Sequence, residues 1–251
     1  MIRLLNDVKG SAVRASDGDI GMVTDYYFDD QRWAIRYLVV DVGNLVRGGF
    51  VLISPIAVRG TDWENQTIDL SIDRERVRSG PTTDVLQPIS RQYETDYYRY
   101  YGWPTYWAGP GIWGAEATPG ALGLITPPST TIGGTSAEPS ERDVRRTVRD
   151  RTGAGLEESR LRSAKEVAGY HIKATDQEAG HIDDYVVDRD TWVIHSIVID
   201  TSNWPGGKTV VLPRERIERV DWSTKQIFVN MTSHEVRNSP EFSEASLSRR
   251  L

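Results

Sequence analysis

The sequence contains no cysteine among its 251 residues, which excludes disulfide bonds, thiolate nucleophiles and zinc sites built on sulfur. It also lacks any run close to the ~20 apolar residues that a membrane-spanning helix needs. The first residues reach Asn6 and Asp7 too early for the apolar core of a signal peptide. These absences predict a cytoplasmic protein. The formal net charge of −6 argues against a surface that follows a nucleic-acid backbone along its whole length.

Recognisable catalytic and metal-binding patterns are also scarce. No glycine-framed serine supports a nucleophile, and the glycine-rich loop at residues 43–49 lacks the Lys-Ser/Thr ending of a phosphate loop. The histidines form no close ligand pair, and the acidic residues between positions 17 and 41 lie in separate turns and at strand ends, where they would not surround a calcium ion. We therefore expect no catalytic residue, no metal and no cofactor. This expectation applies to His171, His181, His195, His234, Asp17, Asp19, Asp25, Asp29, Asp30 and Asp41.

A pattern near the start of the chain returns 159 residues later. The same spacing of 159 residues separates Gly21 from Gly180 and Tyr26 from Tyr185. Residues 17–41 read DGDIGMVTDYYFDDQRWAIRYLVVD, and residues 176–200 read DQEAGHIDDYVVDRDTWVIHSIVID. An ungapped comparison of residues 3–81 with residues 162–240 gives 22 identities in 79 pairs, where unrelated sequences would share roughly 6%. Because a fixed period indicates repeated structural units, we predict an internal duplication.

Each copy has the sequence pattern of a small β domain. Short runs rich in β-branched and aromatic residues are separated by polar turns, which is typical of a small barrel or sandwich. The nearly continuous apolar run within residues 33–42 predicts a strand that is covered on both faces. Asp73, and Thr232 or Ser233 in the second copy, are predicted to cap a final helical turn. Four tryptophans recur in register and are predicted to close turns over the cores: Trp33, Trp63, Trp192 and Trp222.

The predicted fold class is therefore all-β, with two small β-barrels that arose by internal duplication. The first domain covers residues 1–81, the second covers residues 161–240, and residues 82–160 form the connector between them. Residues 241–251 are predicted to be a frayed tail.

The connector changes in composition along its length. Residues 87–113 are rich in aromatics and are predicted to pack against a folded surface, because disordered linkers contain few aromatic residues. Residues 118–140 are rich in Pro, Gly, Ser and Thr and are predicted to be a flexible linker. Residues 141–160 combine charges of both signs with a few apolar residues, which predicts a short helix.

The aromatic segment supplies the candidate binding residues. Its side chains could pack on the chain's own domains, could anchor a protein partner or a second copy of the chain, or could stack on single-stranded nucleic acid. Glu94, Asp96 and Glu116 count against nucleic acid. The candidate partner-binding residues are Tyr93, Tyr97, Tyr98, Tyr101, Trp103, Trp107 and Trp113.

Both copies resemble the PRC-barrel family. The resemblance rests on residues 17–43, followed by FVLISPIAV, and on AGHIDDYVVDRDTWVIHSIVIDTSNW, followed by TVVLPRERI. These stretches are similar to the family's glycine-initiated strand, acidic turn, aliphatic strand ending in Val-Asp, and strand that enters a proline-containing turn. The resemblance implies a small β-barrel of the kind found in the cytoplasmic part of the photosynthetic reaction-centre H subunit and in the C-terminal domain of a ribosome maturation factor.

Such a resemblance implies a non-catalytic docking and assembly module. The expected partner is another protein or a second copy of the chain, and docking to a membrane complex such as a reaction centre would not need a transmembrane helix in this chain. A ribosome- or RNA-associated maturation factor is the first alternative, although the acidic balance counts against nucleic acid. An enzyme or small-ligand-binding protein without a visible motif is the second.

Overall fold

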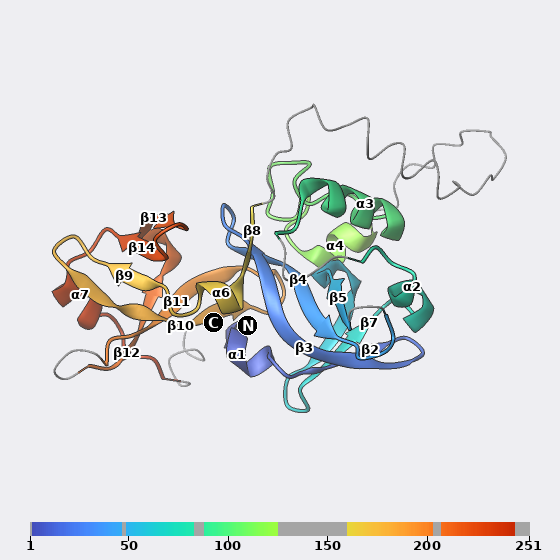
Figure 1. Ribbon diagram of the computed structural model, residues 1–251, viewed down its shortest axis with the longest axis horizontal. Helices are drawn as coiled ribbons and strands as arrows, with labels where there is room; N and C mark the ends of the chain where they lie inside the picture. Colours follow the sequence, from blue (N-terminus) through green and yellow to red (C-terminus); the bar gives the residue numbers. More distant parts are fainter. Residues whose placement is uncertain (1, 47–48, 83–87, 125–159, 203–206, 244–251) are drawn as a thin grey trace.

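The computed structural model describes residues 2–46, 49–82, 88–124, 160–202 and 207–243. This part of the chain is mostly β-strand and forms two seven-stranded sheets with a few short helices (Figure 1). The chain is therefore mainly a β protein, as the strand pattern predicts. Of the helices that the structure describes, none is long and apolar enough to cross a membrane.

The first sheet follows the predicted strands closely. Its hydrogen-bonded order is β5-β4-β3-β2-β7-β6, and among the described residues the two end strands are not paired with each other. A closed barrel is therefore not seen in the hydrogen bonding. The strands are β2 (Ala12–Ala15), β3 (Gly18–Asp29), β4 (Ala34–Asp41), β5 (Phe50–Ile53), β6 (Val58–Asp62) and β7 (Thr67–Leu70).

Three short helices accompany these strands: α1 (Leu5–Val8), the 3-10 turn η1 (Pro55–Ala57) and α2 (Arg74–Arg78). The predicted cap of α2 is confirmed, because the Asp73 carboxylate accepts a hydrogen bond from the Arg76 amide at 2.7 Å. This bond satisfies one of the amide groups that has no partner within the helix.

The second sheet has the corresponding order β12-β11-β10-β9-β14-β13. Thr232 is the residue that caps its final helix, and Glu235 completes a capping box. The strands are β9 (His171–Lys173), β10 (Glu178–Asp188), β11 (Ile194–Asp200), β12 (Thr209–Pro213), β13 (Ile217–Asp221) and β14 (Gln226–Val229). The helical turns are α6 (Ala164–Val167), η2 (Arg214–Arg216) and α7 (Ser233–Arg237).

A short strand from each half pairs with the sheet of the other half. Strand β1 (Ile2–Leu4) pairs with β10, and strand β8 (Leu161–Ser163) pairs with β3. Figure 1 shows β8 beside β3 at the centre of the molecule. The sheets therefore do not follow the predicted boundaries at residues 81 and 161, because each sheet includes a strand from beyond its boundary.

The turns before β4 and β11 also meet across the junction of the two halves. The Ile35 amide donates to the Trp192 carbonyl at 2.8 Å, and the Ile194 amide donates to the Trp33 carbonyl at 2.7 Å. Trp33 and Trp192 are buried and have positive φ values of 53° and 58°, a region that few side chains adopt. These two tryptophans thus pack at the junction.

The other two repeated tryptophans are placed differently. Trp63 and Trp222 are half-buried and pack against the edge of the core. An arginine guanidinium lies over each ring. The distance from its Cζ atom to the ring centroid is 5.0 Å for Arg189 on Trp63 and 4.3 Å for Arg162 on Trp222. Trp33 and Trp192 are the pair buried in the core at turns, as predicted, and they also join the two halves.

The connector covers the outer face of the first sheet. Helices α3 (Arg91–Tyr101) and α4 (Pro119–Leu124) lie over β4 and β5 (Figure 1). Every residue of β4 from Ala34 to Val40 is buried, which confirms the prediction of a strand covered on both faces. Helix α4 occupies the start of the predicted linker at 118–140.

Several predicted features lie largely outside the described residues. These are the rest of the linker at 118–140, the predicted helix at 141–160 up to Arg160, and the tail beyond residue 243. The first tail residues pair with the second sheet, since the Phe242 amide donates to the Thr209 carbonyl at 2.9 Å. The start of the tail, which was expected to fray, is therefore held against β12.

The junction contains a buried carboxyl group, Asp184, in a cavity of about 110 Å³. Burial raises the pKa of Asp184 to about 6, although the Tyr185 and Asn6 amides donate to it and oppose this shift. Asp183 and Asp7 raise its pKa further. The protonated form is therefore the one that the folded junction accommodates more easily.

This raised pKa predicts a pH-dependent stability. An unfolded Asp loses its proton near pH 4, so the contribution of Asp184 is complete below that pH and is lost as the pH rises through about 6. Relative to the wild type, Asp184→Asn should gain roughly 1–3 kcal/mol of unfolding free energy between pH 4 and pH 7.5. Urea unfolding across this range measures the difference. Asp19→Asn, at an exposed position outside the cavity, is the control, and equal profiles for the two variants would contradict the assignment.

Candidate functional site

The aromatic segment forms a helix because its ends are capped. The Ser90 hydroxyl accepts from the Tyr93 amide at 3.1 Å, and Gly102 ends α3 in the left-handed region at φ 70°. Side chains four residues apart lie on one face of a helix, so Tyr93, Tyr97 and Tyr101 align toward the first sheet. The sequence therefore places an aromatic stripe against β4 and β5.

The seven candidate partner-binding residues divide by exposure. Four are buried under the connector, namely Tyr97, Tyr98, Tyr101 and Trp113. Three are half-buried and pack against the core with surface still open to solvent, namely Tyr93, Trp103 and Trp107. The first group packs on the chain itself, and a role for the second group in partner binding stays a prediction.

Tyr97 anchors the helix to the sheet. Its hydroxyl accepts from the Ser54 amide at 3.0 Å and donates to the Leu52 carbonyl at 3.0 Å. Its ring meets Tyr37 edge-on, with 5.1 Å between centroids. A buried phenol with both hydrogen-bonding roles satisfied adds specificity as well as apolar contact.

A charged pair lies beneath this layer. Arg36, in the middle of β4, is completely buried and bonds to Asp29 at 3.1 Å. Its guanidinium lies 3.9 Å from the centroid of Tyr106 and 4.6 Å from that of Trp113, so two aromatic faces replace part of its lost hydration. The loop after α3 is thus folded around a cation from the sheet.

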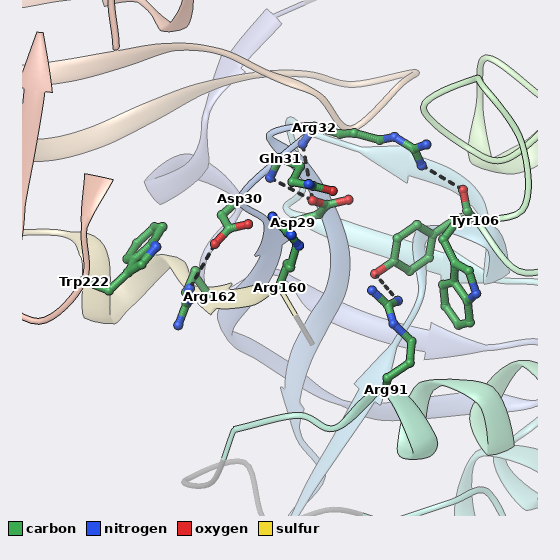
Figure 2. Close-up of a pocket in the computed structure, with 10 residues that line it drawn as sticks. Asp29, Asp30, Gln31, Arg32, Arg91, Tyr106, Arg160, Arg162 and Trp222 are labelled. Carbon is green, nitrogen blue, oxygen red and sulfur yellow. Dashed lines mark hydrogen bonds and ion pairs between the residues drawn. The ribbon is translucent and has the colours of Figure 1, made fainter. Parts of the chain in front are cut away.

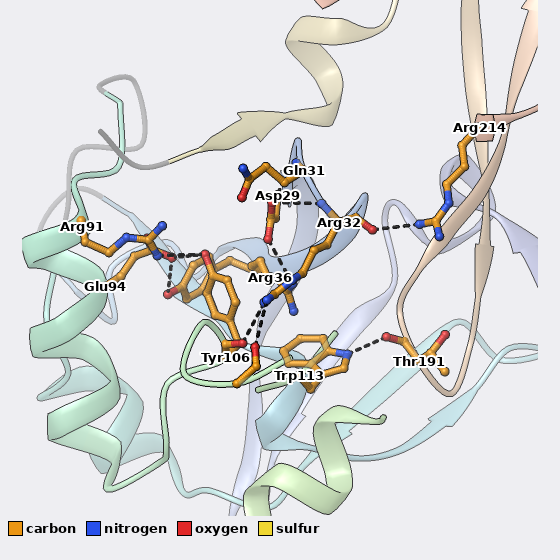
Figure 3. A network of polar contacts seen from close by, with 12 residues as sticks. Asp29, Gln31, Arg32, Arg36, Arg91, Glu94, Tyr106, Trp113, Thr191 and Arg214 are labelled. Atoms are coloured by element: carbon orange, nitrogen blue, oxygen red, sulfur yellow. Dashed lines mark hydrogen bonds and ion pairs between the residues drawn. The ribbon is translucent and has the colours of Figure 1, made fainter. Parts of the chain in front are cut away.

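Glu94 forms a second buried charge centre on the inner face of α3 (Figure 3). It accepts from the Tyr106 hydroxyl at 2.8 Å and pairs with Arg91 at 2.8 Å. Burial raises the pKa of the Tyr106 hydroxyl well above its ordinary value, and Glu94 raises it further. Tyr106 therefore remains a hydrogen-bond donor to the carboxylate.

The connector also reaches the second half of the chain. The Trp113 indole donates to the Thr191 carbonyl at 2.7 Å, and Arg214 donates to the Arg32 carbonyl at 2.8 Å (Figure 3). Arg32 in turn donates to the Tyr106 and Gly109 carbonyls, each at 3.1 Å. Both halves and the connector are fixed to one another around the turn between β3 and β4.

A cavity of about 670 Å³ opens beside this turn, and we call it the arginine groove (Figure 2). Four arginines and only two aspartates line it, in a chain whose net charge is −6. Positive charge is therefore concentrated at this place. The lining residues are Asp29, Asp30, Gln31, Arg32, Arg91, Tyr106, Trp107, Arg160, Arg162 and Trp222.

The two walls of the groove have the same construction. The Cζ atom of Arg91 lies 4.3 Å from the ring centroid of Trp107. The Cζ atom of Arg162 lies 4.3 Å from the ring centroid of Trp222. Arg162 also bonds to Asp30 at 3.2 Å. Stacking and ion pairing hold the guanidinium groups in place, so less side-chain entropy is lost when they bind an anion.

Asp30 forms part of the floor between these walls. Burial raises the pKa of Asp30 above its ordinary value, while the hydrogen bond from Arg162 acts in the opposite direction. The hydrogen bond and charge of Arg162 therefore do not fully offset the cost of burying the Asp30 carboxylate in its charged form. A ligand that brings hydrogen-bond donors to the floor would stabilise it.

Sequence reasoning identified some of these residues but not the groove. Asp29 and Asp30 were predicted turn residues, Trp222 a core residue and Trp107 a candidate contact. Arg160 and Arg162 were not singled out, although alternate residues of a strand point to the same side. The groove joins segments that are distant in sequence, which no local pattern reveals.

The histidines contribute nothing to this site. His171 lies 2.8 Å from Glu178, His181 lies 3.8 Å from Asp200, and His195 is exposed. Within the described ranges, no group of three or more His, Asp or Glu side chains is placed to hold a metal ion.

Comparison with known proteins gives no match to a protein-family model and no match to a curated protein.

The buried Arg36 and Asp29 pair leads to a stability prediction. Arg36→Ala removes the cation and leaves the buried Asp29 carboxylate without its ion-pair partner, which should cost about 3–5 kcal/mol of unfolding free energy. Chemical denaturation of the two proteins measures this loss. His195→Ala, at the corresponding and exposed position of the second sheet, is the matched control and should change stability by no more than about 0.5 kcal/mol. Equal losses would mean that the buried pair contributes little.

Proposed function

We propose that the chain is a cytoplasmic, non-catalytic binding and assembly module, an internally duplicated protein of the PRC-barrel type, which binds a protein partner at the arginine groove. The observation that carries the proposal is the groove itself. It is assembled from the first half, the connector and the second half, and it concentrates cationic and aromatic side chains on an acidic chain.

The arrangement of the two halves supports the duplication. The two sheets have corresponding strand orders, and the exchanged strands begin at equivalent positions of the two copies, Ile2 and Leu161. Asn6 and Lys165 are also equivalent, and their amides donate to Asp184 and Asp25 respectively. A family whose members dock other proteins through small β domains fits this organisation, by analogy of fold alone.

The chemistry of the groove supports binding over catalysis. Arg162 is paired with Asp30, Arg91 with Glu94, and Arg36 with Asp29. Side chains tied in ion pairs and stacked on rings are suited to hold an anion in a fixed geometry. Arginine and tryptophan are also the residues that most often dominate protein interfaces.

The half-buried aromatics are further candidate contacts for a partner. Trp107 belongs to the groove wall, while Trp103 stacks on Tyr101 at 4.6 Å and Tyr93 donates to the Pro81 carbonyl at 3.1 Å. All three are held in place and still have open surface, which lowers the entropy lost on binding. Of the three, Trp107 is the one that lines the groove, so it is the one that a partner seated there would contact.

Crosslinking in cells with the tagged full-length chain tests this function. The wild type should retain a specific protein that the double variant Arg160→Gln with Arg162→Gln loses, as measured by quantitative mass spectrometry. Arg3→Gln is the matched control, because Arg3 is the counterpart of Arg162 in the first copy and lies on the exchanged strand β1, outside the groove. Retention of the same proteins by all three chains would contradict the proposal. Recovery of nucleic acid in their place would favour the RNA-associated alternative.

A further inference from the structure

We infer that the arginine groove binds an extended acidic peptide segment of its partner, with carboxylates at both walls and backbone amide groups over the floor. This inference rests on the proposed function and names the chemistry of the partner. It follows from the positions of two kinds of group within the groove (Figure 2). The arginine side chains offer N–H donors at the walls, and a carboxylate oxygen of Asp30 offers an acceptor at the floor.

One wall offers two arginines, Arg162 in β8 and Arg160 immediately before it. Arg160 precedes β8 and accepts a backbone hydrogen bond from the Asp30 amide at 3.0 Å, which continues the pairing of β8 with β3. Arg160 and Arg162 are separated by a single residue and therefore point to the same side. The exposed Arg160 side chain makes no hydrogen bond within the described part of the chain, and Arg162 uses only its Nε for Asp30.

The opposite wall offers a fixed cation. Arg91 is held by Glu94 at 2.8 Å and by the Tyr106 hydroxyl at 3.3 Å, and it lies over Trp107. This wall is therefore preorganised for a planar oxyanion such as a carboxylate.

The floor between the walls is acidic. Asp29 is already saturated by Arg36 and by the amides of Gln31 and Arg32. Asp30 uses one oxygen for Arg162, and its other oxygen has no hydrogen-bond donor among the described residues. A single anion at the centre would meet this carboxylate, whereas a peptide amide would donate to it.

This arrangement favours an acidic peptide over a polyphosphate chain. A nucleic-acid strand carries a phosphate at every step and would place negative charge over Asp30. An extended peptide with acidic side chains separated by small residues brings carboxylates to the arginines and N–H groups to the floor. The cavity of about 670 Å³ is large enough for a short segment of this kind.

The groove-forming residues occur once per chain. At the positions equivalent to residues 30–32, the second copy has Arg189, Asp190 and Thr191. The connector that supplies Arg91 and Trp107 also occurs only once in the sequence. The inference therefore includes a stoichiometry of one peptide per chain.

Calorimetric titration of the full-length chain tests the inference. The probe is an acetylated and amidated Glu-Gly-Glu-Gly-Glu peptide, and the controls are its Gln counterpart, inorganic phosphate and a short single-stranded RNA. The acidic peptide should bind at one site and weaken as salt is added. Arg160→Gln should weaken binding about tenfold, while Arg3→Gln should leave it unchanged.

The outcomes separate this inference from the proposed function. Failure of the acidic peptide to bind, equal binding of the Gln peptide, or equal loss in Arg3→Gln would overturn the peptide assignment. Binding of phosphate or RNA without the peptide would overturn it in favour of that ligand. If the crosslinked partner is still lost in the Arg160 and Arg162 variant, the proposed function stands with a different partner chemistry. Arg160 is exposed, so its substitution leaves the fold intact for this comparison.

Discussion

The exchange of two short strands, β1 and β8, is the constraint on which the rest of the structure depends. Each sheet lacks a pairing partner for part of its longest strand until the other half supplies one, so β1 completes pairing on β10 and β8 completes pairing on β3. The turns at Trp33 and Trp192 then close against each other through reciprocal backbone bonds. Small β domains bury little surface alone, and this junction lets two of them share one core.

The connector adds an asymmetric feature to this reciprocal exchange of strands. Strand β8 brings Arg160 and Arg162 to the edge of the first sheet, and the connector folds over the other side of the same turn because Arg36 holds its aromatic rings. A symmetric pair of domains would present two equal surfaces. The single connector and the different residues at 189–191 make the surroundings of the arginine groove differ from the equivalent region of the second sheet.

The sequence predicts the strands better than it predicts their assembly. Glycine and aspartate turns, the capping Asp73 and the aliphatic run of β4 follow local rules that hold in the structure. The exchange does not follow from such rules, since Ile2–Leu4 could pair with either of two similar strands, and so short a strand carries little pattern of its own. Arg36 lies within an apolar run, and its burial becomes intelligible only with Asp29, Tyr106 and Trp113 around it.

Hydrogen exchange measured by mass spectrometry on a chain that lacks Ile2–Leu4 tests the central claim most directly. If β1 completes the second sheet, its removal should speed exchange in β10 and at the Trp192 turn, which lie in the other half of the sequence. The strands β2 and β7 of the first sheet should keep their protection. Faster exchange confined to α1 and the first sheet would show that the two halves do not share strands, and would remove the basis for a groove built across them.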